Sequence, residues 1–290
     1  MTDRTVEKVI TSHRQLEGGG FEVRRPFPTR GLQHADPFLL LDEMGPVDYP
    51  PGDAVGAPDH PHRGFETVTY VLAGETEHQD SAGHRGRLGP GDVQWMTAGR
   101  GIVHREMPSR ELQKSGGRVH GFQLWVNLPA RDKMMPPRYQ EIPRTRIPQA
   151  ATPDGLATVA VIAGQALGAS AVIETRTPIS YLHWTLAPGA SVTVPLPPEH
   201  AAYLYAFEGS LTVGAQPVTD GQLAVLSAGD QVTLAVPASA TTRCQALLLS
   251  GVPLREPVVQ YGPFVMNTEA EIRRAILDYQ AGRMGEIAQT

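Results

Sequence analysis

The sequence predicts an all-β protein that ends in one short helix. Three observations support this class: many short apolar runs bounded by turn residues, an approximate internal repeat, and a helical pattern confined to the C-terminal tail. Hydrophobic residues make up 41% of the 290 residues, which is enough to form a core. The 30 glycines and 26 prolines are scattered, as expected for many strands joined by turns.

The candidate strands are short and are separated by turn sequences such as Gly89–Asp92, Ala187–Gly189 and Ala228–Asp230. This spacing is typical of a β-sandwich or β-barrel. The predicted strands are Thr5–Ile10, Gly20–Arg25, Phe38–Leu41, Glu66–Ala73, Asp92–Thr97, Gly121–Leu128, Thr158–Ala163, Tyr181–Leu186, Ser191–Pro195, Tyr203–Phe207, Ser210–Val213, Gln222–Leu226, Gln231–Ala235 and Gln245–Ser250.

The tail has a different pattern. Thr268 and Glu271 are spaced as a capping box, in which each residue bonds the backbone N–H of the other. Apolar residues then follow at helical spacing, and glycines supply the stop. We predict an amphipathic helix over Thr268–Ala281.

An internal repeat divides the chain. Tyr70–Gly74 resembles Tyr205–Gly209, and Gly91–Gly99 resembles Gly221–Gly229. The offsets between the copies are 135 residues (209 − 74) and 130 residues (221 − 91). We therefore predict two copies of one β-domain, over residues 1–145 and 146–290, with the helix closing the second.

The first copy carries a cluster of possible metal ligands. His60 and His62 are two residues apart, so on a strand both point to one side, and Glu66 has the same parity. His104 and Glu106 repeat this spacing about forty residues later. Histidine and carboxylate ligands without thiolates suit Fe(II), Mn, Co, Ni, Cu or Zn, and the open coordination positions are typical of a catalytic metal. Parity alone does not choose between Glu66 and Glu106.

The second copy lacks these ligands. The two offsets place Pro195, Pro197, Leu234 and Val236 opposite the histidines and Glu106. We expect one metal site, in the N-terminal half.

Composition excludes several classes of protein. The net charge of −5 offers no basic surplus for binding nucleic acid directly. The single cysteine, Cys244, rules out an intramolecular disulfide framework and is expected to be a buried, inert thiol. No apolar stretch is long enough to predict a membrane span and the N-terminus does not look like a signal peptide, so we expect a cytoplasmic protein.

Long motifs resemble the pirin family of the cupin superfamily. They run over His60–Val68, Pro90–Glu106, His120–Leu128 and Glu256–Thr268, and the likeness is weak over residues 150–245. The resemblance implies a bicupin of two β-barrel, or jelly-roll, domains facing each other. It also implies one metal, usually Fe(II), in the N-terminal domain, with the ligands at His60, His62, His104 and Glu106 and not at Glu66.

Several pirin-like proteins resemble quercetinases, which open the flavonol ring with O₂ and release carbon monoxide. On this interpretation Glu106 would be the catalytic base that takes the proton of the flavonol hydroxyl. Pocket residues are expected at His120, Gln123, Met96 and Phe122.

The competing interpretation is an iron-dependent redox sensor that binds a transcription factor or a metabolic enzyme. A rim of arginines would then serve a regulatory partner, and a third possibility is a cupin that binds metal without chemistry. His78 and His84 are expected to face solvent, and the resemblance implies a monomer. The rim consists of Arg63, Arg85, Arg87, Arg100 and Arg105.

Overall fold

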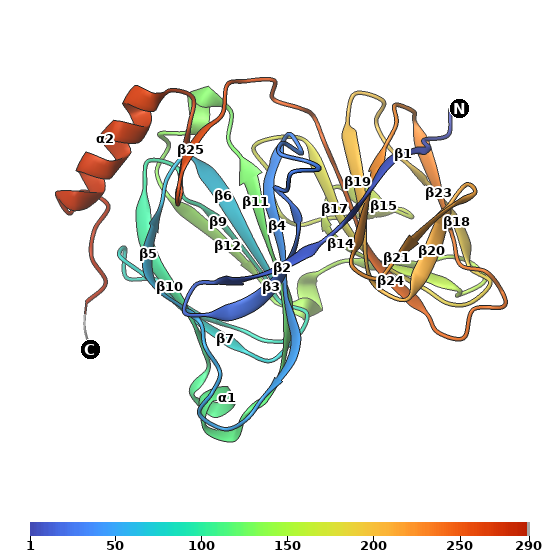
Figure 1. The fold of residues 1–290 in the computed structure, drawn as a ribbon, viewed down its shortest axis with the longest axis horizontal. Coiled ribbons are helices and arrows are strands. Elements are labelled where there is room, and N and C mark those ends of the chain that lie inside the picture. Colours follow the sequence, from blue (N-terminus) through green and yellow to red (C-terminus); the bar gives the residue numbers. More distant parts are fainter. Residues whose placement is uncertain (289–290) are drawn as a thin grey trace. The chain divides into compact units, whose positions relative to one another are not determined.

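The computed structural model describes residues 1–288 and divides the chain into two compact units (Figure 1). The N-terminal barrel holds Arg14–Arg25, Phe38–Arg144 and the chain from Leu254 onward. The C-terminal barrel holds Met1–His13, Pro26–Pro37 and Thr145–Pro253. Each terminal segment thus belongs to the barrel built mainly from the other half of the sequence. The predicted sequence boundary between residues 145 and 146 stays a prediction.

The N-terminal barrel is built from a seven-stranded and a four-stranded antiparallel sheet. In spatial order the larger sheet contains β12 (Arg138–Ile142), β9 (Val93–Thr97), β6 (Phe65–Ala73), β11 (Gly117–Asn127), β4 (Phe38–Tyr49), β3 (Phe21–Phe27) and β2 (His13–Glu17). The smaller sheet contains β5 (Ala57–His62), β10 (Ile102–Pro108), β7 (Thr76–Asp80) and β8 (Arg85–Leu88).

The C-terminal barrel repeats this plan. Its larger sheet contains β1 (Val6–Thr11), β22 (Gln222–Leu226), β19 (Ala201–Glu208), β24 (Cys244–Gly251), β17 (Ile179–Leu186), β14 (Ala157–Ala163) and β13 (Gln149–Ala151). Its smaller sheet contains β18 (Ser191–Pro195), β23 (Gln231–Ala235), β20 (Ser210–Val213) and β21 (Gln216–Thr219).

The remaining elements are short. The predicted C-terminal helix is confirmed as α2 (Glu269–Gln280), and Thr268 and Glu271 form the expected capping box. A second helix, α1 (Arg110–Ser115), lies where the sequence predicted a loop, and Ser109 caps it. The others are η1 (Ala130–Asp132), η2 (Arg144–Arg146), β15 (Gln165–Ala166), β16 (Ala169–Ser170), β25 (Val259–Tyr261) and β26 (Phe264–Met266).

The internal repeat is confirmed, with one correction to its alignment. Ile102 pairs with His62 and His104 with His60, whereas Val232 pairs with Val194 and Leu234 with Val192. The residues equivalent to His60 and His62 are therefore Val192 and Val194, not Pro195 and Pro197. The repeat offset differs there because the turn before β18 is three residues shorter than the 135-residue offset assumed (60 + 135 = 195, against 192).

The core of the C-terminal barrel is apolar throughout. It includes Trp184, Leu204, Leu234 and Leu248, all fully buried. Cys244 belongs to this core, and burial raises the pKa of its thiol to about 12, so the thiol is inert at neutral pH as expected.

In the part of the chain that the structure describes, no helix has the length and apolar character needed to span a membrane.

Candidate metal centre

Three histidines meet on the inner face of the four-stranded sheet. β5 carries His60 and His62, and the neighbouring β10 carries His104 directly opposite His60. The ring centroids are 4.3 Å apart for His60 and His104, 4.7 Å for His60 and His62, and 4.9 Å for His62 and His104. One ring nitrogen from each histidine lies within 4.8 Å of the other two. The structure thus brings together the three histidines that the sequence singled out.

Burial keeps two of these rings neutral. His62 is 3% exposed and His104 is 1% exposed. Burial lowers the pKa of His62 well below its ordinary value; neighbouring His60 lowers it further, and the Pro263 carbonyl partly offsets both. Burial, followed by His62 and His60, lowers the pKa of His104 in the same direction. Neutral imidazoles are the form that binds a metal ion.

The hydrogen bonds of the cluster also fit a metal ion. Neither ring nitrogen of His104 has a hydrogen-bond partner, which is costly for a buried polar group. The Nδ1 of His60 lies 2.7 Å from the Pro58 carbonyl, which only accepts, so Nδ1 carries the proton and Nε2 keeps its lone pair. The three residues therefore fit a divalent transition metal that accepts imidazole nitrogen.

Glu106 lies beside this cluster without belonging to it. The pairing of β10 with β5 shifts register between His104 and Glu106, which changes how Glu106 meets β5. Its Oε1 accepts a hydrogen bond from Thr69 at 2.8 Å, and its Oε2 accepts one from the Gln123 amide at 3.2 Å. Its assignments as fourth ligand and as base stay predictions.

The other conserved-parity candidate, Glu66, is held elsewhere. Glu66 is 1% exposed and accepts a hydrogen bond of 2.6 Å from Thr97. It is not part of the histidine group found among the described residues.

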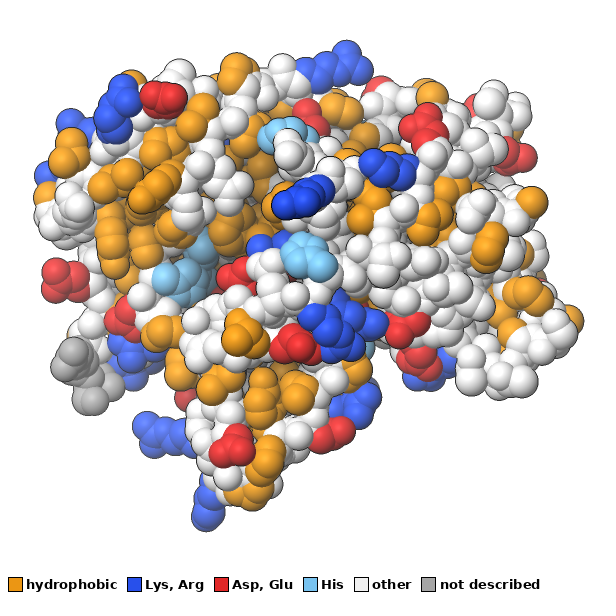
Figure 2. Space-filling view, in the orientation of Figure 1, with side chains coloured by type: hydrophobic (Ala, Val, Ile, Leu, Met, Phe, Trp, Pro, Cys, Tyr) orange, Lys and Arg blue, Asp and Glu red, His pale blue; other side chains and the backbone are white. Residues whose placement is uncertain are grey.

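A cavity of about 590 Å³ opens onto the cluster. His60, His62 and Glu106 lie on its wall, and apolar side chains make up much of the rest. On the left of the face in Figure 2, hydrophobic side chains gather with histidine side chains at their edge. The apolar lining includes Leu40, Met44, Val71, Leu112, Val119 and Trp125. A volume of this size matches a small aromatic molecule better than a peptide.

The structure divides the predicted pocket residues into two pairs. His120 and Gln123 line the cavity, and His120 Nε2 lies 2.9 Å from Glu43 Oε1. Met96 and Phe122 are fully buried and do not line it. Phe122 alternates with Gln123 along β11 and so points to the other face of the sheet, and Met96 packs against Ala98 and Ile102.

Several polar groups at this site were not found from the sequence. Thr69 contacts both Glu106 and Gln123, and Arg25 forms a two-point ion pair with Asp42 on the cavity wall. A lone threonine or an Arg–Asp pair on separate strands has no characteristic spacing. Only the strand register, in which Asp42, Gln123 and Thr69 lie side by side, brings them together.

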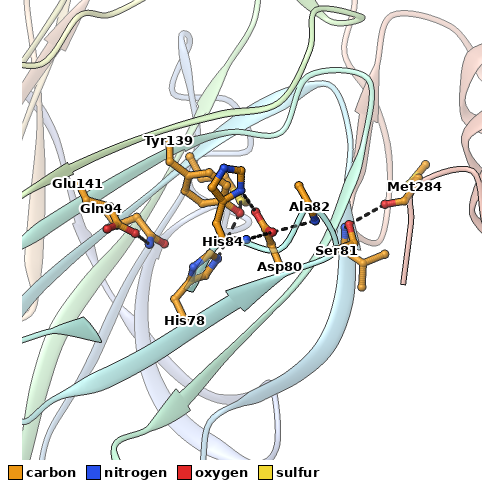
Figure 3. A network of polar contacts seen from close by, with 11 residues as sticks. His78, Asp80, Ser81, Ala82, His84, Gln94, Tyr139, Glu141 and Met284 are labelled. Atoms are coloured by element: carbon orange, nitrogen blue, oxygen red, sulfur yellow. Dashed lines mark hydrogen bonds and ion pairs between the residues drawn. The ribbon is translucent and has the colours of Figure 1, made fainter. Parts of the chain in front are cut away.

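A second polar network lies behind β10 (Figure 3). His78, expected at the surface, is 2% exposed because it points inward from β7 beside Glu106. Its Nε2 lies 3.2 Å from the Tyr139 hydroxyl. Burial and the nearby Asp80 raise the pKa of Tyr139, so this hydroxyl stays protonated. His84, whose side chain is 61% exposed, bonds Asp80 at 2.9 Å and faces solvent as expected.

One arginine of the predicted rim also departs from expectation. Arg63 is only 4% exposed, and its guanidinium pairs with Asp278 of α2 at 2.9 Å. It is buried because the C-terminal segment covers it, which a sequence separation of 215 residues concealed. Arg63 therefore does not offer a surface to a partner.

Comparison with known proteins agrees with this architecture. The family model of pirin matches residues 20–126, and the model of the pirin C-terminal cupin domain matches residues 181–285. A pirin-like protein from Solanum lycopersicum is 47% identical over 285 residues, which is 97% of this chain and 93% of the relative.

Solved structures show the same fold. A quercetin 2,3-dioxygenase from Acinetobacter baumannii is 38% identical, with a TM-score of 0.92 over 99% of this chain and 100% of the other. A bacterial pirin from Escherichia coli, solved in complex with nickel(II), is 18% identical, with a TM-score of 0.63 over 85% of this chain and 98% of the other. With two barrels of equal topology, a histidine cluster in one of them and these matches along its length, the chain belongs to the pirin family of cupins.

Proposed function

We propose that this protein is a metal-dependent dioxygenase of the quercetin 2,3-dioxygenase type, with ferrous iron as its metal. The observation that carries the proposal is the placement of three buried, closely spaced histidines on the wall of a largely apolar cavity. The similarity to the Acinetobacter quercetinase supports the choice of substrate class.

His60, His62 and His104 would hold the metal, and Glu106 would be a fourth ligand or a base beside it. A metal bound there would act as a Lewis acid and lower the pKa of a coordinated hydroxyl. The remaining steps fall to the residues around it.

The apolar wall would hold the flavonol and exclude water from it, with the 3-hydroxyl directed toward the histidines. Glu106 would take the hydroxyl proton on a carboxylate oxygen. Thr69 and Gln123 fix that carboxylate from β6 and β11, so its direction is set before substrate binds. Every atom of the flavonol and of O₂ would then leave in the ring-opened ester and one carbon monoxide.

The test is O₂ uptake and carbon monoxide release with quercetin, using protein loaded anaerobically with Fe(II) and, in parallel, Mn, Co, Ni and Cu. We expect metal-dependent turnover in the wild type and none in His62→Ala. His183→Gln is the matched control, because His183 lies in the other barrel and bonds Gln245. Equal turnover in His62→Ala, or none with any metal in fully loaded wild type, would contradict the proposal. The second result would favour the regulatory alternative.

A further inference from the structure

The C-terminal segment is tied to the N-terminal barrel at positions next to two of the three histidines. β26 runs beside Arg63, the residue after His62. The Arg63 N–H donates to the Pro263 carbonyl at 3.3 Å, and the Val265 N–H donates to the Arg63 carbonyl at 3.0 Å. The backbone that presents His62 is therefore held from outside by residues about two hundred positions later.

α2 strengthens this tie through a buried ion pair. The Arg63 side chain is 5% exposed, donates from Nε to the Arg100 carbonyl at 2.6 Å, and pairs with Asp278 at 2.9 Å. Arg274 and Arg283 also pair with Asp278. Asp278 is thus the point at which the helix fixes the Arg63 side chain.

A separate tie reaches the strand of His104. The Ser81 hydroxyl donates to the Met284 carbonyl at 2.8 Å (Figure 3) and accepts from the Val103 N–H at 3.2 Å. Val103 precedes His104, and its side chain lies in an apolar cluster formed mostly by the C-terminal segment. That cluster contains Val103, Phe264, Met266, Ile272, Ala275, Met284 and Ile287.

A buried lysine closes the same turn from a third side. Lys133 is 1% exposed, and its Nζ donates to the Gly64 carbonyl at 2.7 Å, to Asn127 Oδ1 at 2.6 Å and to the Val265 carbonyl at 3.1 Å. One ammonium thus joins the turn after His62 to β26. A side chain at Gly64 would collide with Val265, because a Cβ there would lie 2.0 Å from its carbonyl oxygen.

From these contacts we infer that the C-terminal segment sets the spacing of the metal-binding histidines, with Asp278 as positioning residue for His62 and Ser81 as positioning residue for His104. Without these ties the triad would keep its residues but lose its preset geometry. Metal affinity would then fall, because the metal would have to draw the histidines together itself. The inference rests on the proposed metal site and is independent of the substrate.

The test measures metal affinity without turnover. Asp278→Asn keeps the size of the side chain but removes its charge, and Ser81→Ala removes the bridge between Met284 and Val103. We expect Asp278→Asn to weaken Ni(II) binding about tenfold, measured by competition with a chromophoric chelator, and Ser81→Ala to weaken it less. Both variants should also change the visible absorption spectrum of bound Co(II). Arg273→Gln is the control, because Arg273 lies on the same helix with its side chain 67% exposed, and it should bind Ni(II) like the wild type.

A purely structural role for the segment would lower the melting temperature of both metal-free variants and leave their Ni(II) affinity and Co(II) spectra unchanged, and that result would overturn the inference. A further measurement needs no variant. If the segment and the metal support each other, Ni(II) must slow amide hydrogen exchange in α2 of the wild type, since coupling is reciprocal. Unchanged exchange, or a wild type that does not bind Ni(II), would also overturn it.

Discussion

The two barrels share one strand order but fill their interiors in opposite ways. At equivalent positions on the four-stranded sheets, the N-terminal barrel has His60, His62 and His104, and the C-terminal barrel has Val192, Val194 and Leu234. The first set faces a cavity and the second is part of a closed apolar core. The same scaffold therefore holds a reactive site or a sealed core depending on a few inward-facing residues, which is why fold alone does not establish function.

Exchanging one equivalent residue in each barrel is the strongest test of this comparison. Leu234→His would place an imidazole in a core without polar partners, and we expect it to lower the free energy of unfolding by about 3 kcal/mol or more. His104→Leu should change the stability of the metal-free protein by less than about 1 kcal/mol, because it removes a buried ring that has no hydrogen-bond partner. Urea unfolding of both metal-free variants measures the contrast. Equal losses would show that the two interiors are energetically alike.

Metal should stabilise only the barrel that carries the histidines. At Ni(II) a hundredfold above its Kd, binding should add about 2.7 kcal/mol to the stability of the folded state. The melting transition of the wild type should therefore rise with Ni(II) concentration, and that of His62→Ala should not. A comparable rise in His62→Ala would place the binding site elsewhere.

Acid should act on the same barrel. Burial holds the pKa values of His62, His104 and His78 below their ordinary value of about 6.5. Below pH 6.5 the unfolded chain takes up protons that the folded chain refuses. The stability of metal-free protein is thus fully present above pH 6.5 and falls as the pH drops from 6.5 toward the folded pKa values, by up to about 1.4 kcal/mol per histidine for each pH unit.

Melting of the metal-free protein at pH 7.5, 6.5 and 5.5 measures this loss. His104→Leu should lose less over the same range, since it has one such histidine fewer. A loss of the same size in that variant would assign the acid sensitivity to other groups.

The smallest effect should come from the sealed core of the other barrel. Cys244→Ala removes one buried sulfur atom and should lower stability by about 1 kcal/mol. Ni(II) affinity should match that of the wild type, because Cys244 belongs to the core of the C-terminal barrel. A change in affinity would show that the two barrels are coupled.

Local sequence patterns predicted most of the fold and part of the site. The capping box at Thr268 predicted α2 to within a residue at each end, because it acts within one helical turn. The spacing of His60, His62 and His104 predicted the cluster, because alternation along a strand fixes the side to which each residue points.

What the sequence did not predict depends on contacts between distant residues. Arg63 looked like a surface arginine until Asp278 covered it, and His78 looked exposed until strand pairing placed it beside Glu106. Thr69 reaches Glu106 and Gln123 only through the register of β6, β10 and β11. No periodicity within one segment records such contacts.

The exchange of terminal segments has a consequence for the order of synthesis. A chain still attached to the ribosome makes His60, His62 and His104 early, but Asp278 and Met284 emerge only at the end of translation. The N-terminal barrel is thus the first to be started and the last to be completed. A nascent chain that stops before Leu254 would contain every metal-binding histidine and yet lack the segment that packs behind them.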